Sequence, residues 1–160
     1  MNIRYMKHSD LIGAAQVHQQ VFGRHKQSPY WIEATLDAFP RFLCFVAEDA
    51  QGILGYLIWA QRSGFRDDAT VELDQIAVLP DRLTDQVGRH LVEESLQHVS
   101  VQLAAQGACV KHINVNVRED DFQHRPYQPA LEAEVAEAIA GLYHVDEALI
   151  ATRETERRAE

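Results

Sequence analysis

The chain has 160 residues, the length of one compact domain that can bury enough surface to fold alone. Hydrophobic residues make up 46% of it, but no run approaches the roughly 18 consecutive apolar residues of a membrane helix. The formal net charge of -9 disfavours nucleic acid and anionic membranes as partners, and it favours cationic substrates such as amines.

The chain begins with a strand and a helix. Asn2 to Met6 is predicted to form an edge strand, and because this stretch lacks the apolar region of a secretory signal we expect a cytoplasmic protein. Apolar residues at helical spacing predict a helix that is capped by Ser9 or Asp10 and ends at Gly23. His18 lies on its apolar face, where we expect a hydrogen-bonded core histidine instead of a ligand or catalyst.

A second helix and a hairpin follow. The helix is predicted between Ser28 and Pro40 and should carry one apolar side, formed by Trp31, Ile32, Leu36 and Phe39. Phe42 to Glu48 and Ile53 to Gln61 are β-rich runs separated by the turn sequence DAQG, which predicts antiparallel neighbours. Trp59 either lines a cleft or belongs to the core, and the core is the commoner place for a strand aromatic.

The central part of the chain is predicted to be a strand, a turn and a helix. Period-2 alternation indicates a strand from Val71 to Val78, and Pro80 ends it because proline lacks a ladder donor. Helical spacing then extends from Thr84 to Ala105, with Thr84 or Asp85 as the cap. The unpaired N–H groups and the positive end of this helix dipole would form an anion-binding cradle.

The last third continues the alternation of strands and helices. A strand from Cys109 to Val117 should lie parallel to the central strand, joined to it by a right-handed crossover. An Ala/Glu-rich helix over Gln128 to Ala140 and a closing strand over Leu142 to Arg153 are predicted next. We therefore expect one α/β (or α+β) domain over residues 1–153 and a charged tail over residues 154–160.

The sequence IAVLP, from Ile76 to Pro80, and the turn after it resemble the GNAT superfamily of acyl-CoA-dependent N-acyltransferases. In that family a strand ending in hydrophobic-Ala-Val leads through Pro into a Q/R-x-x-G-x-G/A turn that holds the CoA pyrophosphate. Here the turn runs from Leu83 to Gly88 and keeps only its last glycine. Leu83 stands at the Gln/Arg position, Gln86 stands at the first glycine, and Asp85 adds a negative charge.

The resemblance implies a GNAT-like fold: a mixed, twisted sheet of six or seven strands with helices on both faces. It also implies acetyl-CoA as co-substrate, with the pantetheine arm on the backbone of one strand segment, formed by Ile76, Ala77 and Val78. The pyrophosphate should meet the N–H groups of the turn and first helical residues, namely Gln86, Val87, Gly88 and Arg89. Arg82 and Arg89 are candidates to replace the missing basic residue.

Amide formation from a thioester needs a base for the amine proton and an acid for the departing thiolate. Glu72 is the candidate base, because the resemblance places a glutamate base five residues before Ala77. Strict alternation would put Glu72 on one face with Asp74, Ile76 and Val78, where two carboxylates favour proton uptake near neutral pH. The alternative is a solvated or salt-bridged strand carboxylate.

Tyr127 is the candidate general acid, because the resemblance places a tyrosine seven residues after the Asn position, which is Asp120 here. Tyr143 is its rival, since the Ala/Glu-rich helix before it could bring this later tyrosine to the cleft. The remaining alternative is that both tyrosines pack at a sheet edge. The loop from Gly23 to Tyr30 is the candidate for acceptor contacts, or it is a plain solvated loop.

A metal site is not predicted. The histidines show no HxxxH or HExxH spacing, and Cys44 and Cys109 form no CxxC pair and are expected to be small buried residues. Two functions stay open: an N-acetyltransferase acting on an amine of a small molecule, peptide or protein, and a GNAT-like binding or regulatory module without productive CoA binding. The sequence does not decide the acceptor, and it leaves a homodimer open.

Overall fold

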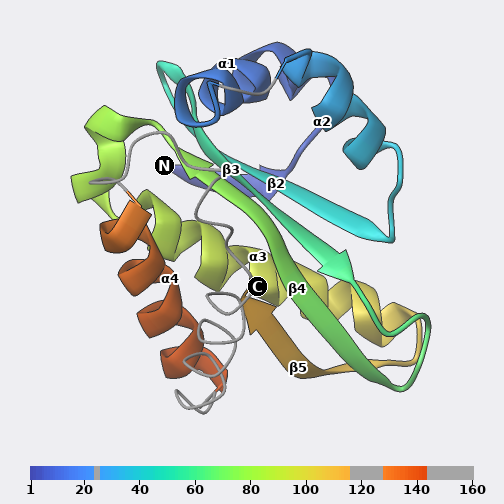
Figure 1. Cartoon of the computed structure of the whole chain (residues 1–160). Helices are drawn as coiled ribbons and strands as arrows, with labels where there is room; N and C mark the ends of the chain where they lie inside the picture. The colour runs from blue at the N-terminus through green and yellow to red at the C-terminus, as the bar shows by residue number, and fades with distance from the viewer. Residues whose placement is uncertain (24–25, 116–127, 144–160) are drawn as a thin grey trace, which may run out of the picture.

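The computed structural model describes residues 1–23, 26–115 and 128–143 (Figure 1). In chain order, its strands are β1 Asn2–Tyr5, β2 Phe42–Asp49, β3 Gly52–Gln61, β4 Asp68–Val78 and β5 Cys109–Val115. The α-helices are α1 Leu11–Val21, α2 Ser28–Leu36, α3 Val87–Ala105 and α4 Gln128–Tyr143, and two 3-10 helices, η1 His8–Asp10 and η2 Pro80–Asp85, precede α1 and α3.

The five described strands form one mixed sheet in the order β1-β2-β3-β4-β5. The pairs from β1 to β4 are antiparallel, and β4 and β5 are parallel, joined through α3. Helices α1 and α2 cover one face, α3 crosses the other face, and α4 lies alongside α3 (Figure 1). The predicted mixed sheet with helices on both faces is confirmed, but the described residues contribute five strands where six or seven were predicted.

Helix α3 is held against the sheet by one apolar stripe and one buried polar contact. Its buried residues recur at helical spacing: Val87, Gly88, Leu91, Val92, Ser95, Leu96, Val99 and Leu103. The fully buried indole of Trp59 donates from Nε1 to Ser95 Oγ at 2.8 Å, so a β3 side chain is fixed to the middle of α3. Trp59 is therefore a core residue and does not line a cleft.

A β-bulge in β4 separates residues that strict alternation would put on one face. Ile58 pairs with Gln75 and Trp59 pairs with Leu73, so Asp74 is an extra residue on β4. Cross-strand partners share a face, so Leu73 lies with Trp59 on the α3 side. Ile76, opposite Leu57, lies on that side too. Leu73 and Ile76 thus lie on the same face although they are three positions apart along β4. In an unbroken strand, side chains on one face are two or four positions apart.

Several sequence predictions are wrong in detail. Cys109 is exposed because it opens the last described strand, whereas Cys44 is buried as predicted. Helix α2 ends at Leu36, so Phe39 lies beyond it, and Trp31 within it is 54% exposed; the helix is shorter and its apolar side narrower than predicted. Helix α4 continues through Tyr143, so the first two residues of the predicted closing strand are helical, and the rest of that strand lies outside the described residues.

Neither predicted side-chain cap is present. Thr84 and Asp85 lie in η2, and α3 begins later, with Gln86 at the N-cap position and no side-chain cap hydrogen bond. Asp10 likewise makes no cap hydrogen bond to α1. It binds Arg4 instead, because a guanidinium on the neighbouring strand offers two charge-assisted donors.

Arg4 ties β1 to β2 and to the start of α1. Its guanidinium donates to Asp10 at 2.7 Å and to Glu48 at 2.8 Å. The hydrogen bond from Arg4 is the main cause that lowers the pKa of Asp10 and of Glu48 below their ordinary values. Burial opposes this effect at both carboxylates.

These lowered pKa values predict a pH-dependent stability. The contribution is complete above the unfolded pKa values, near pH 4, and is lost as pH falls through the lower folded values. Arg4→Met should lower the free energy of unfolding by about 1.5 to 3 kcal/mol at pH 7, and the difference from the wild type should shrink below about pH 4. Urea unfolding from pH 7 to pH 3 measures this, with exposed Arg41→Met as the control. Equal differences at every pH would contradict it.

Candidate functional site

The site predicted from the sequence lies where β4 leads into α3. β4 ends at Val78, the η2 turn follows, and Gln86 connects it to α3 with φ 58° and ψ 32°. This is the left-handed region that glycine adopts most easily. Gln86 stands at the position of the family's first glycine, so the backbone keeps a glycine-like conformation although the residue has changed.

The three β4 residues predicted to contact pantetheine are buried and closely paired. Ile76, Ala77 and Val78 are 4%, 0% and 0% exposed. A Cβ on Gly55, opposite Val78, would lie 2.6 Å from the Ala77 carbonyl oxygen, so the close approach of β3 needs glycine there. The described β4–β5 ladder runs from Asp68↔Cys109 to Leu73↔Val115, while β4 continues to Val78.

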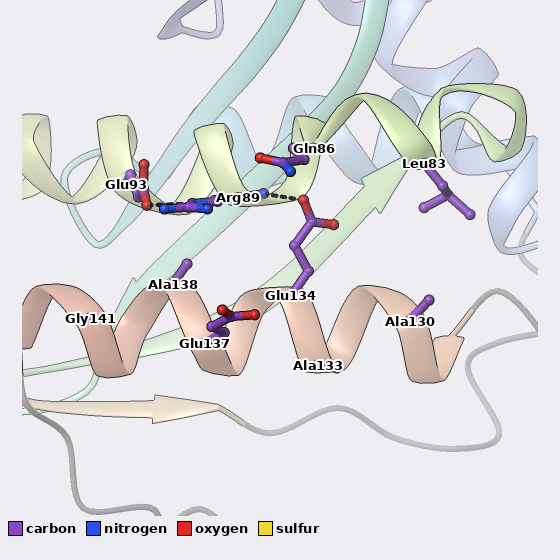
Figure 2. Close-up of a pocket in the computed structure, with 10 residues that line it drawn as sticks. All are labelled: Leu83, Gln86, Arg89, Glu93, Ala130, Ala133, Glu134, Glu137, Ala138 and Gly141. Carbon is purple, nitrogen blue, oxygen red and sulfur yellow. Dashed lines mark hydrogen bonds and ion pairs between the residues drawn. The ribbon is translucent and has the colours of Figure 1, made fainter.

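Of the N–H groups predicted to hold an anion, that of Arg89 does so, but the anion belongs to the chain itself. The Arg89 N–H donates to Glu134 Oε1 of α4 at 3.0 Å. Figure 2 shows Glu134 extending from α4 to the first turn of α3. Gly88 permits this contact, because a Cβ there would lie 2.6 Å from Leu131 Cδ1 and 3.3 Å from Glu134 Oε2.

A pocket of about 520 Å³ lies between the two helices at this point. It is lined by both helices and the turn before α3: Leu83, Gln86, Arg89, Glu93, Ala130, Ala133, Glu134, Glu137, Ala138 and Gly141. One arginine faces three glutamates in this lining. The Arg89 side chain is turned along α3 and donates from Nε to Glu93 at 2.8 Å (Figure 2).

The second candidate cation is engaged as well. Arg82 donates from Nε to Asp85 at 2.6 Å and from Nη1 to Asp49 at 2.9 Å. These hydrogen bonds raise the pKa of Arg82, Asp85 contributing more than Asp49. The pKa of Asp49 is lowered, chiefly by the Gln51 N–H and next by Arg82. Arg82 therefore joins the η2 turn to the β2–β3 hairpin.

The residues in this arrangement do not fit a CoA pyrophosphate. The Arg89 N–H is bonded to a carboxylate, and both nearby guanidinium groups bind carboxylates of the chain. A second anion in the pocket would stand beside Glu93, Glu134 and Glu137 at close range and would be repelled by them. A helix N-terminus stands where the cradle was predicted, but its Arg89 N–H is already bonded to Glu134.

Glu72, the candidate base, lies in β4 opposite Ala60. Because of the bulge, it shares the α1/α2 face with Gln75 and is on the opposite face from Ile76 and Val78, so the predicted shared face is wrong for those two residues. Asp74, the third residue of that prediction, contacts the same Arg62 as Glu72. Arg62 donates from Nε to Glu72 Oε2 at 2.6 Å, and the Glu72 side chain is 16% exposed. The salt-bridged alternative thus describes its contacts.

Of the other predicted site residues, one lies within the described residues and the rest lie outside them. His18 is fully buried with Nδ1 2.7 Å from Ser28 Oγ, as expected of a core histidine. Asp120, Tyr127 and the Tyr143 side chain lie outside the described residues.

Within residues 1–23, 26–115 and 128–143, no three His, Cys, Asp or Glu side chains gather as a metal site. None of the helices in this part of the chain is long and apolar enough to cross a membrane.

Sequence reasoning missed Gly55 and Glu134. A glycine inside a strand is a signal for close backbone approach, and Gly55 fits that rule. Glu134 gave no signal of its own, because it is one of several glutamates in an Ala/Glu-rich helix whose partner is not encoded locally.

No protein-family model matches the chain, and no curated protein matches its sequence. Many solved structures are similar to it in fold, and three of them are acetyltransferases of nearly the same length. An aminoglycoside 6'-N-acetyltransferase from Acinetobacter haemolyticus is 16% identical with a TM-score of 0.63, over 84% of this chain and 89% of that one. A ribosomal-protein-alanine N-acetyltransferase from Brucella melitensis is 12% identical with a TM-score of 0.62, over 83% and 90%. AAC(6')-Iy, solved with a CoA-based bisubstrate analogue, is 18% identical with a TM-score of 0.61, over 83% and 88%.

The left-handed residue before α3 gives a test of the turn. Gln86→Gly should raise the free energy of unfolding by about 1 kcal/mol, because glycine adopts a φ of 58° without the Cβ strain. Gln106→Gly, at the other end of α3 where φ is -92°, should lower it by roughly 0.5 to 1 kcal/mol. Chemical denaturation of both variants makes the comparison. If Gln86→Gly destabilises as much as Gln106→Gly, the turn is not left-handed in solution.

Proposed function

We propose that this chain, which has the fold of the GNAT N-acetyltransferases, transfers an acyl group from acetyl-CoA to an amine. The observation that carries the proposal is the corner between β4 and α3, where a buried strand end leads through a left-handed residue into a helix N-terminus. The CoA-based bisubstrate analogue in one similar structure supports it. We place the activity in one domain over residues 1–153, in the cytoplasm.

The chain's own part in holding the co-substrate would be played mainly by backbone atoms. Acetyl-CoA supplies the activated acyl group when it is bound. The peptide groups of Ile76, Ala77 and Val78 and the N–H groups from Gln86 to Arg89 are the proposed contacts, and backbone recognition tolerates changes of side chain. These N–H groups become accessible to an external anion only when Glu134 is not bonded to Arg89.

We propose Glu72 as the group that accepts the amine proton, directly or through a water molecule. It lies on the sheet face that α1 and α2 cover, the same face as Gln75. Arg62, bonded at 2.6 Å, would fix the direction of its carboxylate. Tyr127 is the proposed donor to the leaving thiolate, and Tyr143 is its rival.

The acceptor is proposed only as an amine. The net charge of -9 favours an acceptor that carries positive charge in solution. The similar structures include an aminoglycoside acetyltransferase and a ribosomal-protein-alanine acetyltransferase, so a small molecule and a protein N-terminus both agree with the fold.

A second function, a binding or regulatory module that does not bind CoA productively, is favoured by one observation. The α3 N-terminus already holds Glu134, and the pocket beside it carries more carboxylates than guanidinium groups. If Glu134 stays there at all times, the cradle stabilises the domain instead of holding a co-substrate.

Calorimetry with acetyl-CoA separates the two functions. The enzyme predicts submillimolar binding that Gly88→Glu weakens at least tenfold, because the new side chain fills the space beside the Arg89 N–H and brings its own carboxylate to the proposed pyrophosphate position. Val101→Glu adds the same charge on the exposed side of α3 and should leave binding unchanged. Binding that Gly88→Glu does not affect would place the co-substrate elsewhere, and no binding at millimolar acetyl-CoA would favour the module.

Proton transfer can be tested once an acceptor amine is found. Glu72→Gln and Tyr127→Phe should each lower kcat by roughly a hundredfold, the usual scale for a lost acid or base. Asp74→Asn is the control for Glu72, because Asp74 contacts the same Arg62 at 3.6 Å. Equal losses in both acidic variants would assign the effect to Arg62 pairing. If Tyr127→Phe leaves kcat unchanged and Tyr143→Phe lowers it strongly, Tyr143 is the general acid.

A further inference from the structure

We propose that α4 is a built-in competitor of acyl-CoA, in which the Glu134 carboxylate takes the pyrophosphate position and must leave before the co-substrate binds. This inference rests on the proposed function. It resolves the disagreement between a fold that implies a CoA cradle and a cradle that is filled.

The Glu134 carboxylate and a pyrophosphate are chemically alike as ligands of a helix N-terminus. A carboxylate and a phosphate oxygen both accept hydrogen bonds from the exposed N–H groups of a helix N-terminus, and both are favoured by the positive end of its dipole. The Arg89 N–H can serve Glu134, at 3.0 Å, or an external oxygen in its place. Occupation by one therefore excludes the other.

The packing of α4 against α3 places Glu134 beside the Arg89 N–H. Helix α4 has a buried side that follows helical spacing, formed by Leu131, Val135, Ala138 and Ile139. Leu131 lies over Gly88, and any larger residue at position 88 would push it away. The glycine that the family uses for the pyrophosphate serves here to bring α4 close to α3.

Other carboxylates surround the contact between Glu134 and the Arg89 N–H. Glu134 shares its pocket with Glu93 and Glu137, while Arg89 is turned toward Glu93. Like charges at this range oppose one another, so Glu93 and Glu137 offset part of the stabilisation that the bond from the Arg89 N–H to Glu134 gives the docked α4. A ligand that binds better to the undocked state shifts the population toward it.

Acetyl-CoA affinity, measured by calorimetry, tests the competition. Glu134→Gln should bind acetyl-CoA about tenfold more tightly than the wild type, because the charge-assisted bond to Arg89 is lost. Glu134→Ala should bind acetyl-CoA still more tightly than Glu134→Gln, because it leaves no acceptor for the Arg89 N–H. Glu94→Gln removes the same charge from an exposed side chain of α3 outside the pocket lining, and it should change the affinity less than about threefold.

Leu131→Ala separates displacement of α4 from a simple change of charge. This variant weakens the packing of α4 over Gly88 and keeps every carboxylate, so the competition predicts tighter acetyl-CoA binding here too. Circular dichroism confirms that each variant is folded. Unchanged affinity in both Leu131→Ala and Glu134→Ala would overturn the competition.

The same titrations distinguish failure of the inference from failure of the function. If the wild type and all variants bind acetyl-CoA equally well, the function stands and the competition is wrong. If none of them binds at millimolar acetyl-CoA, including Glu134→Ala, both proposals are overturned.

Discussion

The hydrogen bond from the Arg89 N–H to Glu134 is the contact on which the interpretation of this protein depends. It exists because the sheet positions the start of α3: Trp59 fixes the helix through Ser95, and the left-handed Gln86 connects the helix to the end of β4. The first turn of α3 then presents donors with no partner inside the helix. These donors and the helix dipole favour one anion at this point, and α4 brings it from the chain itself.

Local sequence patterns predicted the elements well, because hydrophobic periodicity and turn residues are properties of short segments. The hairpin, the parallel β4–β5 pair and the Ala/Glu-rich helix are all present. The bulge at Asp74 was not predictable, since one extra residue leaves the alternation of β4 almost unchanged and shows only in its pairing with β3. The contacts of Glu72 and Glu134 were equally hidden, because their partners, Arg62 and Arg89, are set by tertiary packing.

The turn before α3 shows how a motif can lose residues and keep its geometry. Gln86, which stands at the first glycine position of the GNAT pattern that this turn resembles, has a left-handed backbone that glycine adopts most easily, and Gly88 leaves the space that a close neighbour requires. The basic position has changed more deeply. Arg82 and Arg89 are present near the turn, but Asp85, Asp49 and Glu93 engage them. A helix N-terminus is thus present at the turn, while the guanidinium groups near it bind carboxylates of the chain.

Hydrogen exchange of the unmodified protein, followed by mass spectrometry with and without acetyl-CoA, tests the competition at the α3 N-terminus most directly. The account predicts opposite changes in two segments: slower exchange at residues 86–90, where the external anion takes the N–H groups, and faster exchange across residues 128–143, because α4 has left α3. Slower exchange in both segments, with α4 closing over the bound co-substrate, would contradict it.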